Sequence, residues 1–139
     1  MITAVDTSVL LDIFGADPEF GKGSADALRA SLGLGSVIAC EIVWAETTAC
    51  FPEPTAAEAA LARLRIDFSP LDSSTALATG QRWRTYRHAV RTRERVIADF
   101  LIGAHALATS DRLLTRDRGF YRQNFKGLRV LDPSLGRLE

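Results

Sequence analysis

The sequence predicts an α/β fold in which a mostly parallel β-sheet is covered by helices on both faces. Two observations lead to this prediction. Short apolar runs typical of strands alternate along the whole chain with segments of helical periodicity. In addition, 139 residues, 47% of them apolar and 24% charged, are enough to bury one hydrophobic core. We therefore expect a single domain that spans residues 1–139.

The first half of the chain is expected to contain three strands and four helices. Asp6-Thr7-Ser8 follows an apolar run and has the composition of a helix N-cap. Pro52 and Pro54 are expected to end a helix, and Thr55-Ala56-Ala57-Glu58 has the form of a capping box. The expected strands cover residues 2–5, 37–39 and 66–69, and the expected helices cover 9–14, 24–34, 41–50 and 55–64.

The second half continues the alternation of strands and helices. Ser73 or Ser74 is expected to cap a long helix, and Asp132-Pro133 is expected to close the last strand. The expected helices cover residues 75–90, 97–108 and 119–125, and the expected strands cover 113–115 and 129–131. Ligands of such sheets bind at the carboxyl ends of the strands, so we expect the site at that edge.

The sequence contains no segment that indicates export or a membrane. Residues 1–6 lack the basic and apolar regions of a signal peptide, and no run of about 18 apolar residues could span a bilayer. We therefore expect a cytoplasmic protein. Cys40 and Cys50 fit neither a disulfide framework nor a CxxC metal site, and are expected to remain thiols.

Charge is distributed unevenly although the formal net charge is zero. Residues 1–80 carry 11 acidic and 4 basic side chains, whereas residues 81–130 carry 4 acidic and 12 basic ones. Either the second half meets a polyanionic partner, or the two halves neutralise each other across the fold. A basic stretch could hold an RNA backbone, with Arg93 as a substrate-binding candidate, or it could be a solvated helix face. This stretch consists of Arg82, Arg84, Arg87, His88, Arg91, Arg93 and Arg95.

Other side chains of the second half are interpreted more simply. His88 and His105 are read as surface or packed residues rather than as general bases. Trp83 and Tyr86, three residues apart, could either stack on bases or pack in the fold.

Carboxylates from distant parts of the chain are expected to meet at one edge of the sheet. Asp6 follows the first expected strand and Asp117 follows the fourth. Asp99 lies in the first turn of an apolar helix, where an unpaired acid is costly to bury. Glu46 and Glu41 lie five residues apart on one helix, so only one of them can face the site. We choose Glu46, because the helix dipole accounts for Glu41.

A cluster of carboxylates needs a cation. Two ionised carboxylates about 5 Å apart repel each other by roughly 3 kcal/mol at an effective dielectric constant of 20. Mg²⁺ or Mn²⁺ is the expected occupant, because these ions prefer oxygen ligands and the chain has no set of His and Cys residues for zinc. Taken singly, each acid also has a structural reading: Asp6 as an N-cap, Asp99 as a cap of its own helix, and Asp117 as a turn residue.

Four motifs in this order resemble the PIN-domain ribonucleases, and more narrowly the VapC-type toxins of bacterial toxin-antitoxin pairs. The resemblance covers nearly the whole chain. The motifs are Val5-Asp6-Thr7-Ser8-Val9-Leu10-Leu11-Asp12, Trp44-Ala45-Glu46, Ala98-Asp99-Phe100-Leu101-Ile102-Gly103-Ala104-His105-Ala106 and Leu113-Leu114-Thr115-Arg116-Asp117-Arg118-Gly119-Phe120-Tyr121.

The resemblance implies a three-layer α/β/α sandwich that hydrolyses RNA with Mg²⁺ or Mn²⁺. It implies an acidic cluster of Asp6, Glu46, Asp99 and Asp117, with Asp6, Asp99 and Asp117 as metal ligands. It also implies hydroxyl groups near the site, which belong to Thr7, Ser8 and Thr115. Homodimers and inhibition by a cognate antitoxin are further implications. Asp111 is a second candidate for the position of Asp117, although we interpret it as a turn residue.

Two other classes of protein compete with this interpretation. A phosphatase of the haloacid dehalogenase type also begins with a strand and an aspartate, but it needs a second acid at the position of Ser8. A non-catalytic module that binds RNA or protein is the stronger rival. Such a module would have no reason to keep all four acids, and it would leave RNA uncut.

Overall fold

The computed structural model describes residues 1–89, 95–135 and 137–138. Strands and helices alternate through this part of the chain, as the sequence predicts. The elements are β1 (Ile2–Val5), α1 (Thr7–Phe14), α2 (Gly21–Leu34), β2 (Ser36–Ala39), α3 (Glu41–Thr48), α4 (Pro54–Arg63), β3 (Ile66–Phe68), α5 (Ser73–Ala89), α6 (Ile97–Thr109), β4 (Arg112–Leu114), α7 (Arg118–Asn124), β5 (Val130–Asp132) and β6 (Arg137–Leu138).

The sheet has the strand order β3-β2-β1-β4-β5-β6. The first five strands of this order run parallel, and β6 pairs antiparallel with β5. The predicted mostly parallel α/β fold is therefore confirmed. The edge strand β6 was not predicted, because two residues are too few to produce a recognisable apolar run.

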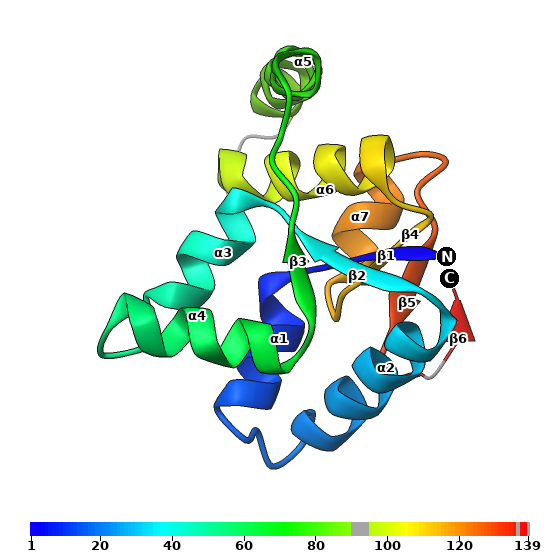
Figure 1. The fold of residues 1–139 in the computed structure, drawn as a ribbon. Coiled ribbons are helices and arrows are strands. Elements are labelled where there is room, and N and C mark those ends of the chain that lie inside the picture. The colour runs from blue at the N-terminus through cyan, green and yellow to red at the C-terminus, as the bar shows by residue number, and fades with distance from the viewer. Residues whose placement is uncertain (90–94, 136, 139) are drawn as a thin grey trace.

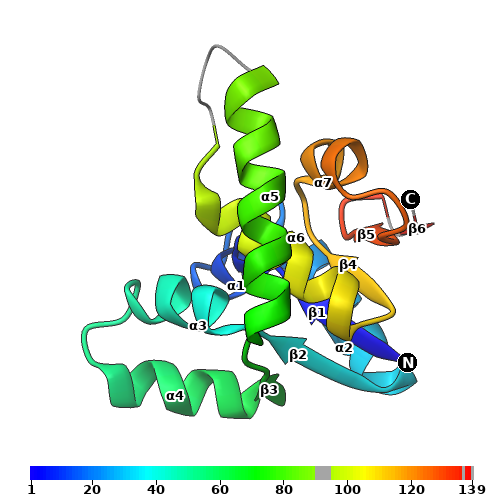
Figure 2. The same ribbon diagram turned by 90° about the horizontal axis from the view of Figure 1, so that it is seen from above.

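Helices cover both faces of the sheet and make a three-layer arrangement (Figure 1). Helices α1 and α2 lie on one face, and α6 and α7 lie on the other. Helix α5 packs on α6 outside the three layers, as both views show (Figures 1 and 2). In the part of the chain that the structure describes, no helix is both long and apolar enough to cross a membrane.

The hydrogen bonds of the sheet align the carboxyl ends of β1, β4 and β5. Val5 of β1 lies opposite Leu114 of β4, and the Asp6 N–H donates to the Leu114 carbonyl at 2.9 Å. One residue later, the Thr115 N–H donates to the Leu131 carbonyl of β5 at 3.0 Å. The residues that follow β1, β4 and β5 therefore share one edge, at which the sequence predicts the site.

Helix α6 lies close to the sheet and to the segment after α7. A Cβ atom at Gly103 would stand only 2.4 Å from the ring of Phe125, so only glycine allows this approach. Phe100, on the same helix, is fully buried among aromatic rings. This packing fixes the helix that carries Asp99.

Two predicted helix starts were wrong. The capping box at Thr55 does not form, because Pro54 already occupies the first turn of α4 and Glu53 stands at the N-cap position. Neither Ser73 nor Ser74 caps α5. Instead, the Asp72 carboxylate accepts the Thr75 N–H at 2.8 Å. A carboxylate is a better acceptor for the exposed amides of a helix start than a serine hydroxyl.

Candidate active site

Asp6 is the buried centre of the acidic edge. It directly follows β1 and is the N-cap of α1, where one carboxylate oxygen accepts the Thr7 N–H at 2.8 Å. The other oxygen accepts the Thr115 hydroxyl at 2.7 Å and the Ser8 hydroxyl at 3.4 Å. Asp6 is only 7% exposed. The structural and the functional readings of this residue are therefore compatible, since one carboxylate can cap the helix and still have free lone pairs.

The electrostatic surroundings of Asp6 oppose its ionisation. Burial raises the pKa of Asp6 from 3.8 to about 6, although the hydrogen bonds from Thr115 and Thr7 lower it. The negative charges of Asp99 and Asp117 raise the pKa further. Three acids that are distant in sequence therefore act on one another in the fold.

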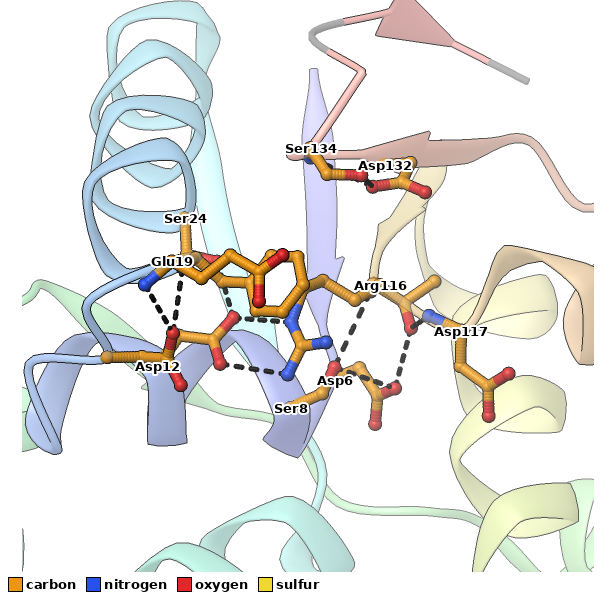
Figure 3. A network of polar contacts seen from close by, with 12 residues as sticks. Asp6, Ser8, Asp12, Glu19, Ser24, Arg116, Asp117, Asp132 and Ser134 are labelled. Atoms are coloured by element: carbon orange, nitrogen blue, oxygen red, sulfur yellow. Dashed lines mark hydrogen bonds and ion pairs between the residues drawn. The ribbon is translucent and has the colours of Figure 1, made fainter.

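Asp117 is joined to Asp6 through one hydroxyl. The Thr115 hydroxyl oxygen, which donates to Asp6, also accepts the Asp117 N–H at 2.9 Å. Figure 3 shows the Asp6 and Asp117 side chains pointing the same way from the ends of their strands. The two carboxylate oxygens of Asp117 accept hydrogen bonds from the two terminal nitrogens of Arg95, and the Nη2–Oδ1 distance is 3.1 Å.

Asp99 completes this group from the first turn of α6. Its carboxylate accepts the Val96 N–H at 3.3 Å. Burial raises the pKa of Asp99, and the charge of Asp117 adds to the rise, while the Val96 N–H and Arg95 act against it. The buried hydroxyl of Tyr121 responds to the same field: burial raises its pKa first, and Asp6, Asp99 and Asp117 each raise it further. Tyr121 therefore lies within electrostatic reach of all three acids.

Glu46 reaches the same edge through Thr7. The Thr7 hydroxyl donates to Glu46 at 2.7 Å, and the Glu46 side chain is exposed. Glu41 is directed elsewhere, because its carboxylate accepts the Leu71 N–H at 3.0 Å. Asp111 lies before β4, at the opposite edge of the sheet, and accepts the Ile2 N–H at 2.6 Å. Of the two candidate positions, the structure brings Asp117 and not Asp111 to Asp6.

The donor set fits a hard divalent cation in its chemistry. Asp6, Asp99 and Asp117 offer carboxylate oxygens, the ligand type that Mg²⁺ and Mn²⁺ prefer. As placed in the described ranges, however, no three acidic, histidine or cysteine side chains surround one point closely enough to hold an ion. Arg95 donates to both Asp117 oxygens, and its positive charge opposes a cation at the same carboxylate.

A second network positions the segment between β4 and α7, and sequence reasoning missed it. Arg116 donates to both oxygens of the buried Asp12, at 2.6 and 2.9 Å, and Ser24 of α2 donates to the same carboxylate at 2.8 Å. The Arg116 guanidinium also lies 4.1 Å from the centre of the Phe20 ring. Figure 3 shows this network beside Asp6. Since Arg116 stands between Thr115 and Asp117, its anchor on α1 and α2 fixes both site residues.

The arginines of the basic stretch have different surroundings in the fold, because some bond within the protein and others are exposed. Arg82 donates to the Asn124 carbonyl at 2.9 Å, and Arg95 pairs with Asp117. Arg84 and Arg87 are exposed on α5, whereas Arg93 lies outside the described residues. Trp83 and Tyr86 stack on each other and contact Phe100, so these two aromatic side chains pack in the fold. The Arg82 guanidinium also lies 4.7 Å from the centre of the Phe125 ring, and that of Arg87 lies 6.0 Å from the centre of the Trp83 ring.

Comparison with protein-family models gives a match to the PIN domain over residues 3–126. The chain belongs to the PIN domain family. The four acids discussed above all lie within the matched residues. A comparison with curated protein sequences gives no match.

Solved structures support the same assignment of the fold. VapBC2 from Rickettsia felis, bound to a DNA fragment from its promoter, has a TM-score of 0.71 at 17% identity, over 94% of this chain and 98% of the other. FitAcB from Neisseria gonorrhoeae has a TM-score of 0.63 at 26% identity, over 96% and 98%. VapC20 from Mycobacterium tuberculosis, a toxin that cleaves the sarcin-ricin loop, has a TM-score of 0.55 at 20% identity, over 80% and 86%. This PIN domain therefore resembles VapC toxins in structure.

Proposed function

We propose that this PIN domain is a ribonuclease that depends on Mg²⁺ or Mn²⁺. The observation that carries the proposal is the buried Asp6, whose pKa is raised to about 6 by burial and by the charges of Asp99 and Asp117. The ionised carboxylates of these three acids repel one another, and a divalent cation bound between them would remove this repulsion. The PIN family match and the likeness to a toxin that cleaves the sarcin-ricin loop support RNA as the substrate.

The proposed metal ligands are Asp6, Asp99 and Asp117. A bound cation supplies an activated water and stabilises the negative charge that develops on the phosphodiester. The Thr115 hydroxyl orients Asp6 by donating to one of its oxygens and fixes Asp117 by accepting its N–H. These contacts are the kind of outer hydrogen bonds that hold ligating carboxylates in place.

Glu46, Thr7 and Ser8 form the proposed rim of the site. Glu46 is exposed and accepts the Thr7 hydroxyl, so its carboxylate is held at the entrance rather than in the core. We propose that Glu46 contributes to catalysis with the three buried or half-buried acids. Thr7 and Ser8 carry hydroxyls at the start of α1, where N–H groups and hydroxyls favour a phosphate.

The RNA backbone is proposed to cross the basic surface of the second half. Arg84 and Arg87 are exposed on α5 and available for phosphates, and Arg93 remains a proposed contact outside the described residues. Because these contacts are electrostatic, RNA affinity should fall steeply as salt concentration rises.

The proposed biological role is that of the toxin in a toxin-antitoxin pair, acting in the cytoplasm. Structural neighbours include VapBC proteins and a toxin-antitoxin complex from Klebsiella pneumoniae. We propose that a cognate antitoxin binds the chain and that the chain forms a homodimer. Induced expression in bacteria should arrest growth, and the Asp6→Asn variant should not. Equal arrest by both proteins would contradict a role of the acidic site in toxicity.

The direct test is cleavage of a structured RNA by the purified protein. We expect cleavage with Mg²⁺ or Mn²⁺ and none in EDTA, and complete loss in Asp6→Asn and in Asp99→Asn. The matched control is Asp111→Asn, which removes a carboxylate at the opposite edge and should cut at the wild-type rate. Protein that binds RNA equally with and without divalent cations, and leaves it uncut, would instead be a non-catalytic binding module.

A further inference from the structure

Arg95 brings a positive charge into the acidic site. It stands just before α6, and its guanidinium donates to both oxygens of Asp117. The same guanidinium lies 4.5 Å from the centre of the Phe120 ring, which supports one of its faces. The Arg95 side chain is 31% exposed, so it lies at the boundary between the site and solvent.

The guanidinium has more donors than Asp117 uses. Arginine carries five N–H groups, and two terminal nitrogens bond to Asp117. Within the described residues, no other acceptor takes the remaining N–H groups. Arg95 can therefore bind a second oxyanion without a large movement of its side chain.

Charge balance makes Arg95 a competitor of any cation in the site. Asp6, Asp99 and Asp117 bring three negative charges, and Arg95 offsets one of them. Both Asp117 oxygens accept hydrogen bonds from Arg95, so a cation at the same carboxylate would lie beside the guanidinium charge. Cation binding by Asp117 therefore repels Arg95 and weakens its hold on Asp117. Asp117 can therefore bind either the Arg95 guanidinium or the cation. When it binds the cation, the guanidinium is free to bind another anion.

We propose that Arg95 is a phosphate-binding residue of this site, and that it exchanges Asp117 for a phosphodiester oxygen of the RNA when Asp117 ligates the cation. The inference rests on the proposed ribonuclease function and adds a substrate contact to it. Guanidinium groups bind phosphates with paired hydrogen bonds, which a lysine ammonium cannot reproduce. The Phe120 ring keeps the guanidinium next to the acids during the exchange.

Metal binding without RNA tests the competition. Calorimetric titration with Mn²⁺ should show roughly tenfold tighter binding to Arg95→Ala than to wild type, because the positive charge that competes for Asp117 is removed. The control is Arg29→Ala on α2, which removes an exposed charge at 75% side-chain exposure and should leave Mn²⁺ affinity unchanged. Unchanged or weaker Mn²⁺ binding by Arg95→Ala would overturn the exchange.

Steady-state cleavage of a structured RNA at saturating Mg²⁺ tests the phosphate contact. Arg95→Ala should raise KM about tenfold or more, and Arg95→Lys should restore only part of it, because lysine keeps the charge but not the paired geometry. A KM equal to that of wild type in a folded, cutting Arg95→Ala would overturn the contact. Wild-type protein that cuts no RNA would overturn the proposed function instead, and the Mn²⁺ titration would still decide the competition.

Discussion

Replacing Asp6 by asparagine should stabilise the metal-free protein. The pKa of Asp6 is about 6 in the folded protein, against the ordinary value of 3.8. Near neutral pH the ionised carboxylate is therefore less favourable in the fold than in the unfolded chain. This difference corresponds to about 3 kcal/mol. The substitution removes the charge and keeps the size of the side chain, so this cost disappears.

One hydrogen bond offsets part of the gain. Asparagine can still accept the Thr7 N–H, because asparagine and aspartate are equally good N-caps. The amide nitrogen cannot accept the Thr115 hydroxyl, and losing that bond costs about 1 kcal/mol. The net stabilisation is about 2 kcal/mol, or a rise in Tm of roughly 7 °C for a domain of this size.

Thermal unfolding in EDTA at several pH values is the assay. A raised carboxyl pKa means that the folded state holds its proton more tightly, so this group favours folding at low pH. The benefit is lost as pH rises from 3.8 through 6. The gap in Tm between Asp6→Asn and wild type should therefore be largest above pH 7 and shrink towards pH 4. Asp111→Asn is the control, and its Tm at pH 7.5 should equal that of wild type. An Asp6→Asn protein that melts several degrees below wild type at pH 7.5 would refute the reasoning.

Three further predictions concern residues around the site. Arg116→Ala should lower the free energy of unfolding by about 3 kcal/mol in urea, because it leaves the buried Asp12 carboxylate without its cation; a change below 0.5 kcal/mol would contradict the anchoring role. Burial lowers the pKa of His105, so the contribution of this residue to wild-type stability should be complete above pH 6.5 and fall as pH drops below it. His105→Gln can keep the hydrogen bond to Ser69. Between pH 7.5 and 5.5 its free energy of unfolding should fall by up to about 1 kcal/mol less than that of wild type, and equal falls would argue against a buried neutral histidine. Glu46→Gln should slow RNA cleavage about 10- to 100-fold at an unchanged Tm; an unchanged rate would remove Glu46 from the proposed site.

Much of the fold could be predicted from the sequence because its strands are short and mostly buried. Strands β1, β2, β4 and β5 bury most of their apolar side chains, so each appears as an apolar run between polar turn residues. The errors arose where two local signals competed. At the start of α4, Pro54 took the position that the Thr55 capping box needed, and at α5 the preceding Asp72 took the role expected of serine.

The acids of the site could be found because each has a local signal. Asp6 and Asp117 follow strands, and Asp99 is an acid in an apolar helix. Their roles as metal ligands and catalysts remain proposals. The sequence also predicted that Asp6 and Asp117 meet at one edge, but the Thr115 hydroxyl that bonds to both residues became visible only in the fold.

The cations of the site could not be predicted. Arg116 pairs with Asp12, which lies 104 residues earlier, and no sequence spacing indicates a contact over that distance. Arg95 looks like every other arginine in the basic stretch of the sequence. Only the position of α6 against α7 shows that Arg95 faces Asp117 while Arg84 faces solvent.

The central claim is that Asp6, Asp99 and Asp117 share one divalent cation. The most direct measurement is anomalous diffraction from a crystal soaked in Mn²⁺. We predict a manganese peak within ligand distance, about 2.2 Å, of carboxylate oxygens from these residues, with Arg95 moved off at least one oxygen of Asp117. A soaked crystal with its manganese elsewhere on the molecule, and with Arg95 still bonded to both oxygens of Asp117, would contradict the claim.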